Sequence, residues 1–516
     1  QTPGLTAGTD FSTLSVSGAV TLGGTLNVTH LGGFTPTAGM NFTVLSYGSR
    51  TGTSAFATIA AGGLNYTPTA GATSFAIQFQ ALLLNTFTGN AINNSWDNPA
   101  NWSLGHVPTI GEDVVIPAGS VFTVILSAPG EAAHSLTSQQ SLTITSTGTL
   151  TFGSGTSTIN GTLTITGGTL TNNGALTVNV FALNGGSFIG SGTLTTGTFT
   201  LTGGSFGNGI DATGLVVSSL FSHSAGIFNT TGAVSITQAS GPLTLTQALN
   251  SGALTINVPA GNLTIQDAIV SAAGTMDITV SGNLNVVAVA APTQLKSTGL
   301  QTIGANGILV QGAAAGTDFS SAIVGGGGQN ITAGAAGIVL NGGTGGFGNF
   351  ADILVPDGSL GGQTITINGG GSFNLNGGSG QFNSAVVQST GAGGQTITFT
   401  GAGSVLNIRG GSGGISSNYA EVASLMTQAI HFLAGGAINL TGGNIGTEAD
   451  ATIQALGSQT IDGNPDITLR GGTSGGSVNR GNFAEIGAFG APTDVQTISA
   501  HNLTLLGGAG VESFAV

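Results

Sequence analysis

The sequence contains no cysteine, and this absence excludes a disulfide framework, thiol chemistry and any metal site with cysteine ligands. It also has no run approaching the ~20 apolar residues that cross a membrane as a helix, so membrane insertion is not expected. No secretory signal is present and the first residue is Gln1, which indicates a processed product or a segment of a longer chain.

Basic residues are scarce. Five of them stand against 19 acidic residues, which gives a net charge of −14. Binding to nucleic acid or to an anionic membrane needs clustered Lys and Arg, so neither is an expected partner. The polar residues are mainly Thr, Ser and Asn, a composition that suits an extracellular or cell-surface protein, and we expect that location.

Glycine is abundant, with 93 residues, whereas proline is limited to 13 and apolar residues make up 40% of the chain. Collagen needs glycine at every third position together with much proline, and a disordered linker would contain less Val, Ile and Leu. The apolar residues occur in alternating runs, so the composition predicts β-structure with many tight corners.

A short phrase of the form Gln-x-Ile recurs through the C-terminal half at intervals of 28 to 37 residues. A period of this size is typical of a solenoid. Each unit also contains an alternating segment ending in two glycines and a short apolar segment around alanine. Three strands with glycine corners predict one coil of a three-sided β-solenoid, or parallel β-helix, of about 33 residues. The repeat anchors are Gln301, Gln329, Gln363, Gln395, Gln428, Gln459 and Gln496.

The predicted fold class is therefore all-β, with four segments. Residues 1–84 form a β-rich N-terminal block, which we interpret as a module end or a coupling domain. Residues 85–118 contain both tryptophans and are expected to cap or open the solenoid. Residues 119–295 are a Thr-rich solenoid with shorter, less regular coils, and residues 296–516 are the regular solenoid of seven repeats.

Two segments carry a resemblance to a known family. The first spans residues 33–58 and includes Gly33-Phe34-Thr35-Pro36-Thr37-Ala38-Gly39, and the second spans residues 96–117 and opens with Trp96-Asp97-Asn98-Pro99-Ala100-Asn101-Trp102. Both resemble segments of bacterial filamentous-haemagglutinin-like and autotransporter-type β-helical surface exoproteins. In that family the first segment tends to close a module and the second to open one. The resemblance thus implies the end of one module joined to the start of the next.

Trp96 and Trp102 are the only tryptophans, and they allow two interpretations. Their rings could form a platform on which glycans stack. Alternatively, both rings plug the end of the first coil, because open strand edges pair with whatever they meet and a solenoid must close them. We favour the plug.

Catalysis is not expected. Polysaccharide lyases and hydrolases built on the β-helix scaffold need carboxylates clustered on one flank. Here the carboxylates are spread along the chain, and the closest pairs considered are Asp352 with Asp357 and Asp462 with Asp466. The six histidines show no metal-ligand spacing. We therefore predict a protein that is not an enzyme, with no catalytic residue, no metal and no cofactor.

Gly-Gly-x-Gly runs at residues 342–345, 377–380 and 410–413 are similar to those of the calcium-binding nonapeptide roll. That roll needs Asp two residues after the third glycine, where this chain has Phe347, Phe382 and Ile415, so the hard cation lacks ligands. We interpret these glycines as corners that need a positive φ.

One column of the regular repeat carries charge. The outward position of the third strand is predicted to hold, in successive units, Asp352, Ala385, Glu421, Thr452 and Glu485. Acids in every second coil are about 10 Å apart, close to the screening length at physiological salt. We interpret the alternation as a device for solubility and for correct register.

These features predict an extracellular structural protein, a β-solenoid rod that assembles head to tail into a filament or forms part of a giant surface fibre. Its partner is then another copy of itself. The alternatives are a surface adhesin that binds glycans and, third, a β-helix polysaccharide lyase or hydrolase.

Overall fold

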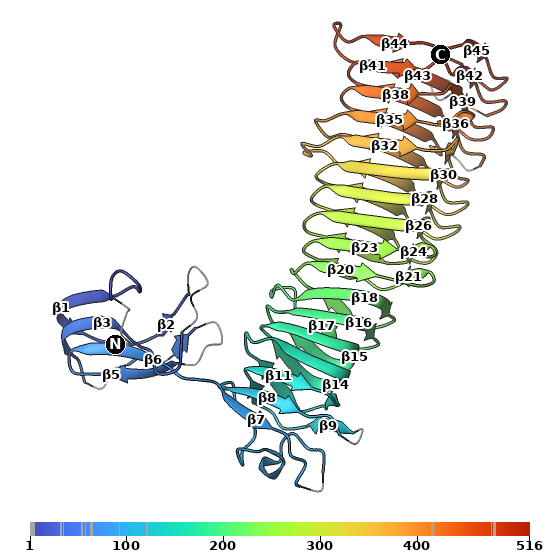
Figure 1. Ribbon diagram of the computed structural model, residues 1–516. Coiled ribbons are helices and arrows are strands. Elements are labelled where there is room, and N and C mark those ends of the chain that lie inside the picture. The colour runs from blue at the N-terminus through green and yellow to red at the C-terminus, as the bar shows by residue number, and fades with distance from the viewer. Residues whose placement is uncertain are drawn as a thin grey trace. The chain divides into compact units, whose positions relative to one another are not determined.

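The computed structural model describes residues 6–516 except 31–33, 35, 53–54, 57, 62–65, 92, 120–121, 414–416, 476 and 478–480. The chain divides into two compact units, Gln1–Thr196 and Gly197–Val516, and Figure 1 labels their strands. The only helical element in the described ranges is a 3₁₀ turn, η1 (Pro99–Asn101). Nothing in those ranges forms a helix long and apolar enough to cross a bilayer.

The N-terminal block combines parallel and antiparallel pairing. β1 pairs in parallel with β3 and β2 with β4, whereas β6 pairs antiparallel with both β3 and β5. Leu14 lies opposite Leu45 and Thr25 opposite Thr58, so the parallel part already has the spacing of one solenoid coil. The strands are β1 (Leu14–Val20), β2 (Thr25–Asn27), β3 (Asn41–Arg50), β4 (Thr58–Ala60), β5 (Tyr66–Ala70) and β6 (Ser74–Phe79).

The rest of the first unit is a stack of short coils. Leu142 lies opposite Leu163 and Thr158 opposite Thr177, which are 21 and 19 residues apart, as expected for shorter coils. β8 pairs with both β7 and β11, so the segment 85–118 supplies strands to the first coil as well as a cap. The strands are β7 (Leu83–Thr86), β8 (Glu112–Ile116), β9 (Thr123–Leu126), β10 (Glu131–Ala133), β11 (Ser135–Ser138), β12 (Ser141–Ile144), β13 (Thr149–Phe152), β14 (Ser157–Asn172) and β15 (Ala175–Ile189).

The boundary between the two units lies within β16 (Thr193–Leu201). This boundary falls inside residues 119–295, which were predicted to form one segment. The second unit then begins with further short coils. Leu254 lies opposite Met276, 22 residues on. The strands are β17 (Ser205–Phe206), β18 (Gly214–His223), β19 (Ile227–Asn229), β20 (Val234–Thr237), β21 (Leu243–Leu245), β22 (Leu249–Ser251), β23 (Leu254–Val258), β24 (Leu263–Gln266), β25 (Ile269–Ala272), β26 (Met276–Val287) and β27 (Thr293–Ser297).

From Gln301 onward the coils have three sides, which confirms the predicted three-sided β-solenoid. In the coils that begin at Gln301 and Gln329 one long strand covers the first two sides, and β30 accordingly pairs with both β32 and β33 of the next coil. β32, β33 and β34 pair in parallel with β35, β36 and β37, the corresponding strands of the next coil. The strands are β28 (Gln301–Gln311), β29 (Ser321–Gly325), β30 (Gln329–Asn341), β31 (Ala351–Val355), β32 (Gln363–Ile367), β33 (Ser372–Asn376), β34 (Ala385–Ser389), β35 (Gln395–Phe399), β36 (Ser404–Arg409), β37 (Ala420–Ser424), β38 (Gln428–Phe432), β39 (Gly436–Thr441), β40 (Ala451–Ala455), β41 (Gln459–Asp462), β42 (Asp466–Arg470), β43 (Ala484–Ala488), β44 (Gln496–Ile498) and β45 (Asn502–Leu506).

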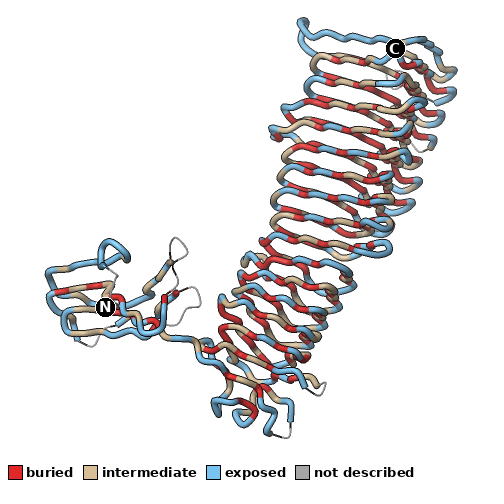
Figure 2. Tube along the Cα trace, viewed as in Figure 1, coloured by how far each residue is buried: buried red, intermediate tan, exposed pale blue. Residues whose placement is uncertain are grey.

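The core of the second unit follows the period-2 alternation of the sequence. In β32 the alternate residues Gln363, Ile365 and Ile367 are buried, and the intervening threonines face outward. Figure 2 shows buried and less buried residues alternating along the strands. Larger side chains stack from coil to coil, as in Phe399 and Phe432, whose ring centroids are 4.4 Å apart with an interplanar angle of 10°.

The Gly-Gly-x-Gly runs are explained by close backbone approach, and the interpretation that they need a positive φ is wrong. None of the glycines at 342–345, 377–380 or 410–413 has a positive φ. A Cβ atom on Gly378 would lie 2.0 Å from the carbonyl oxygen of Gly343, and one on Gly411 would lie 2.1 Å from that of Gly378. Any side chain here would push the stacked corners apart.

Asp267 fixes the segment 289–291, which lies where the shorter coils are followed by the longer ones. Its Oδ1 accepts hydrogen bonds from the backbone N–H groups of Val289, Ala290 and Ala291 at 2.8, 2.9 and 3.0 Å. Burial opposes ionisation, but these three donors outweigh it and lower the pKa of Asp267. The side chain thus closes the loop between β26 and β27.

Replacing this carboxylate should loosen that loop. We expect Asp267→Ala to lower the free energy of unfolding by ~2–3 kcal/mol, because the bonds to an ionised acceptor are lost and the backbone keeps a φ of 53° that alanine disfavours. Thermal denaturation and hydrogen exchange at residues 289–291 measure the effect. Asp277→Ala, on the exposed face of β26, is the matched control and should change neither.

Candidate functional site

The seven anchor glutamines form a side-chain ladder inside the second unit. Register places them opposite one another in successive coils, and all but Gln496 are buried. Each Nε2 donates to the Oε1 of the glutamine one coil earlier, at 2.7 to 2.9 Å. The same nitrogen donates to a backbone carbonyl of the third strand, such as Ile323 for Gln329 and Val422 for Gln428.

The ladder is polar, because every amide points the same way. At its first rung Gln301 Nε2 donates to the backbone oxygen of Leu295 at 3.2 Å and contacts Met276 Sδ at 3.4 Å. At its last rung Gln496 uses both N–H groups, on Gln459 and Ile486, and no donor in the described chain reaches its Oε1. Aligned amide dipoles polarise one another, so the stack behaves as one network.

A second amide ladder runs along the outside of the next strand. Asn407 Nδ2 donates to Asn374 Oδ1 at 2.8 Å, and Asn439 Nδ2 donates to Asn407 Oδ1 at 3.0 Å. These asparagines were not predicted to form a ladder. The signal was present as Asn at the centre of three aligned Leu-Asn-Leu-like phrases.

Breaking the buried ladder in the middle should be costly. We expect Gln395→Leu to lower the free energy of unfolding by ~2–4 kcal/mol, because in the core it leaves one N–H of Gln428 Nε2 unpaired, the other still bonded to Val422, and removes the donor to Gln363 Oε1. Chemical denaturation measures the loss. Gln496→Leu is the matched control, since this residue is exposed and closes only one bond to a neighbouring glutamine. Equal losses for the two variants would contradict a cooperative ladder.

The acidic column lies on the outward face of the third strands, with one correction. Val386, not Ala385, lies between Asp352 and Glu421. Ala385 is fully buried and points inward, so its assignment to the column was wrong. The column that register defines contains Ala322, Asp352, Val386, Glu421, Thr452 and Glu485.

Asp450 joins this acidic face from a position that the sequence did not single out. It directly precedes β40, and its Oδ1 accepts the backbone N–H of Phe483 at 2.9 Å. We call Asp352, Glu421, Asp450 and Glu485 the acidic face. Each side chain stands on an outward position, yet none is fully exposed.

Burial changes the acidity of this face. It raises the pKa of Asp352 to about 7, and Asp352 Oδ1 is buried without a hydrogen-bond partner. It also raises the pKa of Asp450 to about 7, where Phe483 opposes the rise and the neighbouring carboxylates reinforce it. Burial raises the pKa of Glu421 and Glu485 as well. Asp352 and Asp450 can therefore hold protons near neutral pH.

The carboxylate pairs considered from the sequence are not paired in the fold. Asp352 lies on β31, whereas Asp357 is exposed in the turn that follows it. Asp462 contacts His431 at 2.8 Å and Asp466 contacts His501 at 2.9 Å, in both cases between successive coils. Within the described ranges, no three His, Asp or Glu side chains are placed to hold a metal ion.

The stability of the second unit should therefore depend on pH. A carboxyl group whose pKa is raised from 3.8 to about 7 stabilises the fold fully below pH 3.8, and this contribution is lost as pH rises towards 7. We expect the free energy of unfolding to fall by ~2–4 kcal/mol between pH 5 and pH 8.

Thermal denaturation across this pH range tests the prediction. Asp352→Asn should make the slope less steep, because the amide stays neutral throughout, and Asp352→Asn combined with Asp450→Asn should reduce it further. Asp357→Asn is the control and should keep the wild-type slope, since Asp357 is exposed. A profile that is flat or that rises between pH 5 and pH 8 in the wild-type protein would contradict the assignment.

Both tryptophans are inside the first unit. Trp96 is 0% exposed and Trp102 is 3% exposed, and their ring centroids are 4.8 Å apart. Trp102 Nε1 donates to the backbone oxygen of Trp96 at 2.7 Å, and its ring also packs edge-on against Phe87. Neither ring offers an exposed face for a sugar, so the geometry is that of a plug at the first coil.

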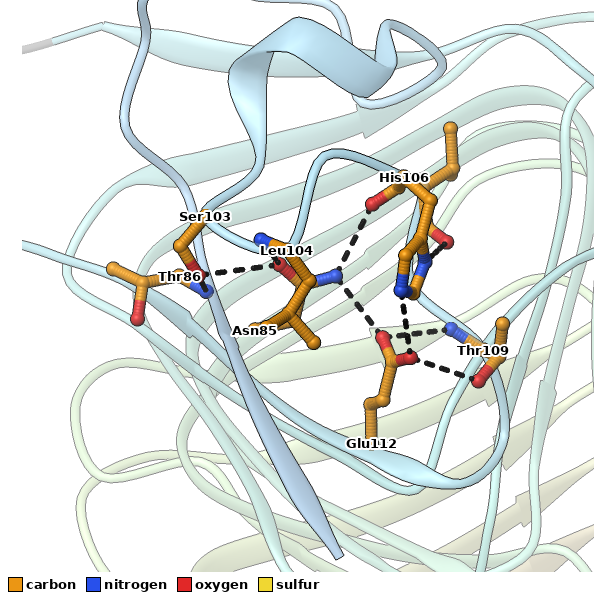
Figure 3. Close-up of polar contacts among 8 residues, drawn as sticks. Asn85, Thr86, Ser103, Leu104, His106, Thr109 and Glu112 are labelled. Atoms are coloured by element: carbon orange, nitrogen blue, oxygen red, sulfur yellow. Dashed lines mark hydrogen bonds and ion pairs between the residues drawn. The ribbon is translucent and has the colours of Figure 1, made fainter.

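A buried polar network fastens the same segment (Figure 3). Asn85 and Glu112 are 0% and 3% exposed, and Asn85 Nδ2 donates to Glu112 Oε2 at 3.0 Å. Thr109 donates to both carboxylate oxygens, through N–H and Oγ1, each at 3.2 Å. His106 Nε2 lies 3.5 Å from Glu112 Oε1. Glu112 thus holds the end of the loop 87–111 against β7.

The first of the two segments that carry the family resemblance falls partly outside the described residues, at 33, 35, 53–54 and 57. Its described part contains β3, which pairs in parallel with β1 and antiparallel with β6. Searches against protein-family models, curated proteins and solved structures found no match for this chain. The resemblance therefore stays a prediction, and the fold itself is the finding.

Proposed function

We propose that this protein is an extracellular structural element, a β-solenoid rod that works by being long, regular and resistant, and that assembles end to end. The observation that supports it best is the glutamine ladder. A column of seven amides, six of them buried and each bonded to the next, adds side-chain bonds to the main-chain pairing of successive coils. Such a column resists separation or slippage of the coils, and a rod needs that resistance.

The surface supports the same proposal. Outward positions of the regular strands are mainly Thr, Asn and Gln, and the chain has only five basic residues. Threonine is β-branched and favours strands, and asparagine ladders bond neighbours along the rod. We do not assign glycan binding to Trp96 and Trp102, because both rings are buried.

Sedimentation and electron microscopy over a range of protein concentrations test this function. We expect single chains at low concentration and end-to-end strings at high concentration, with bundles resistant to protease. Particles that stay single and uniform at every concentration would contradict the assembly. Export of the protein to the cell surface, followed by fractionation or surface labelling, tests the location separately.

A further inference from the structure

Two phenylalanine side chains are exposed at one corner of the regular solenoid. Phe347 and Phe382 lie in successive coils, in the loops that precede β31 and β34, and they are 42% and 37% exposed. Phe347 forms a backbone bridge with Gln381, the residue before Phe382, and the two ring centroids are 5.3 Å apart with an interplanar angle of 69°. Both coils have a further coil on each side, so the rings are exposed within the stack.

The backbone at Phe382 makes this exposure unusual. The corner position that it occupies has a positive φ in three successive coils, with 59° at Asp318, 69° at Gly348 and 56° at Phe382. Glycine adopts this left-handed conformation without strain and aspartate tolerates it, whereas a bulky side chain is disfavoured there. Phe382 nevertheless stays more than a third exposed, so burial offsets little of the strain. A strained, exposed aromatic residue points to a function other than packing.

An exposed aspartate lies beside the two rings, one coil earlier. The backbone N–H of Asp318 donates to the carbonyl oxygen of Phe347 at 2.8 Å. The Asp318 carboxylate lies over Gly348, since a Cβ atom on that glycine would be 2.5 Å from Oδ1. A carboxylate and two aromatic rings thus share one corner of the solenoid. We call Asp318, Phe347 and Phe382 the corner patch.

The charge around the corner patch is of one sign. Residues 301–394, which form the three coils that carry it, contain three aspartates and no lysine or arginine. The whole chain has a net charge of −14, and a negative surface attracts positively charged partners. The face of an aromatic ring also attracts a cation, and an arginine guanidinium stacks on such a face. The rings and the charge therefore favour the same kind of ligand.

We propose that the corner patch binds an arginine- or lysine-bearing segment of another protein. The cationic group would lie between the Asp318 carboxylate and the rings of Phe347 and Phe382, and the aliphatic part of its side chain would cover the rings. A second copy of this chain fits poorly as that partner, because it has only five basic residues. A neutral sugar could stack on the rings but would make no use of the local charge. The inference does not depend on end-to-end assembly.

Fluorescence anisotropy with a labelled oligo-arginine peptide measures the binding. Asp318→Asn removes the charge of the corner patch, and the double variant Phe347→Thr with Phe382→Asn removes both rings. Asparagine tolerates a positive φ, so the corner should stay folded. Asp357→Asn and Leu360→Asn are the matched controls, because both residues are exposed in the corner that follows β31. Circular dichroism verifies that each variant is folded.

Binding at the corner patch predicts that each site variant weakens peptide binding by at least ~3-fold, whereas both controls bind as the wild type does. Added peptide should also slow hydrogen exchange at residues 317–318 and 347–348. Equal weakening by Asp318→Asn and Asp357→Asn would mean attraction by net charge alone, and the inference is then wrong. It is also wrong if the site variants bind like the wild type, if the wild type does not bind the peptide, or if a neutral oligosaccharide binds at the patch in its place.

Discussion

In-register stacking of parallel strands is the constraint on which this molecule depends. When each coil lies directly on the previous one, a residue type that recurs at the coil period forms a continuous column. An apolar column is then self-consistent, because leucine packs on leucine. A polar column inside the core must bond to itself. Glutamine does so because its amide has both donor and acceptor, and the ladder from Gln301 to Gln496 satisfies each buried amide through the next.

The same constraint makes the two sides of a coil different. Because the strands and the glutamine amides all point the same way from coil to coil, the two ends of a solenoid present different groups. Each end also exposes unpaired backbone groups unless a cap or another coil covers it. In the first unit the loop 87–111 serves as a cap, with Trp96 and Trp102 packed inside it and Glu112 fastened to Asn85 and Thr109.

Stacking also limits where charge can be placed. Identical acids in every coil would repel at one-coil spacing, and the column of the third strands sets Val386 between Asp352 and Glu421 and Thr452 between Glu421 and Glu485. Asp450 places a carboxylate back in the coil of Thr452, where burial, with Glu421 and Glu485 nearby, raises its pKa. Partial burial adds a second effect, since it favours the protonated forms. Spacing along the column and the raised pKa values thus concern the same few side chains.

The amino-acid sequence by itself determined the all-β class, the three strands per coil, the shorter coils before residue 296 and the seven anchor glutamines. These features depend on local alternation and on a recurring phrase, both of which can be counted along the chain. Only the tertiary structure decided that Ala385 is inside and Val386 outside, that Asp450 joins the acidic face, that the tryptophan rings are buried and that the paired glycines avoid backbone clashes. Each of these depends on which residues of different coils lie opposite one another. That register is set by corner lengths that vary from coil to coil, and strand spacing in the sequence does not reveal it.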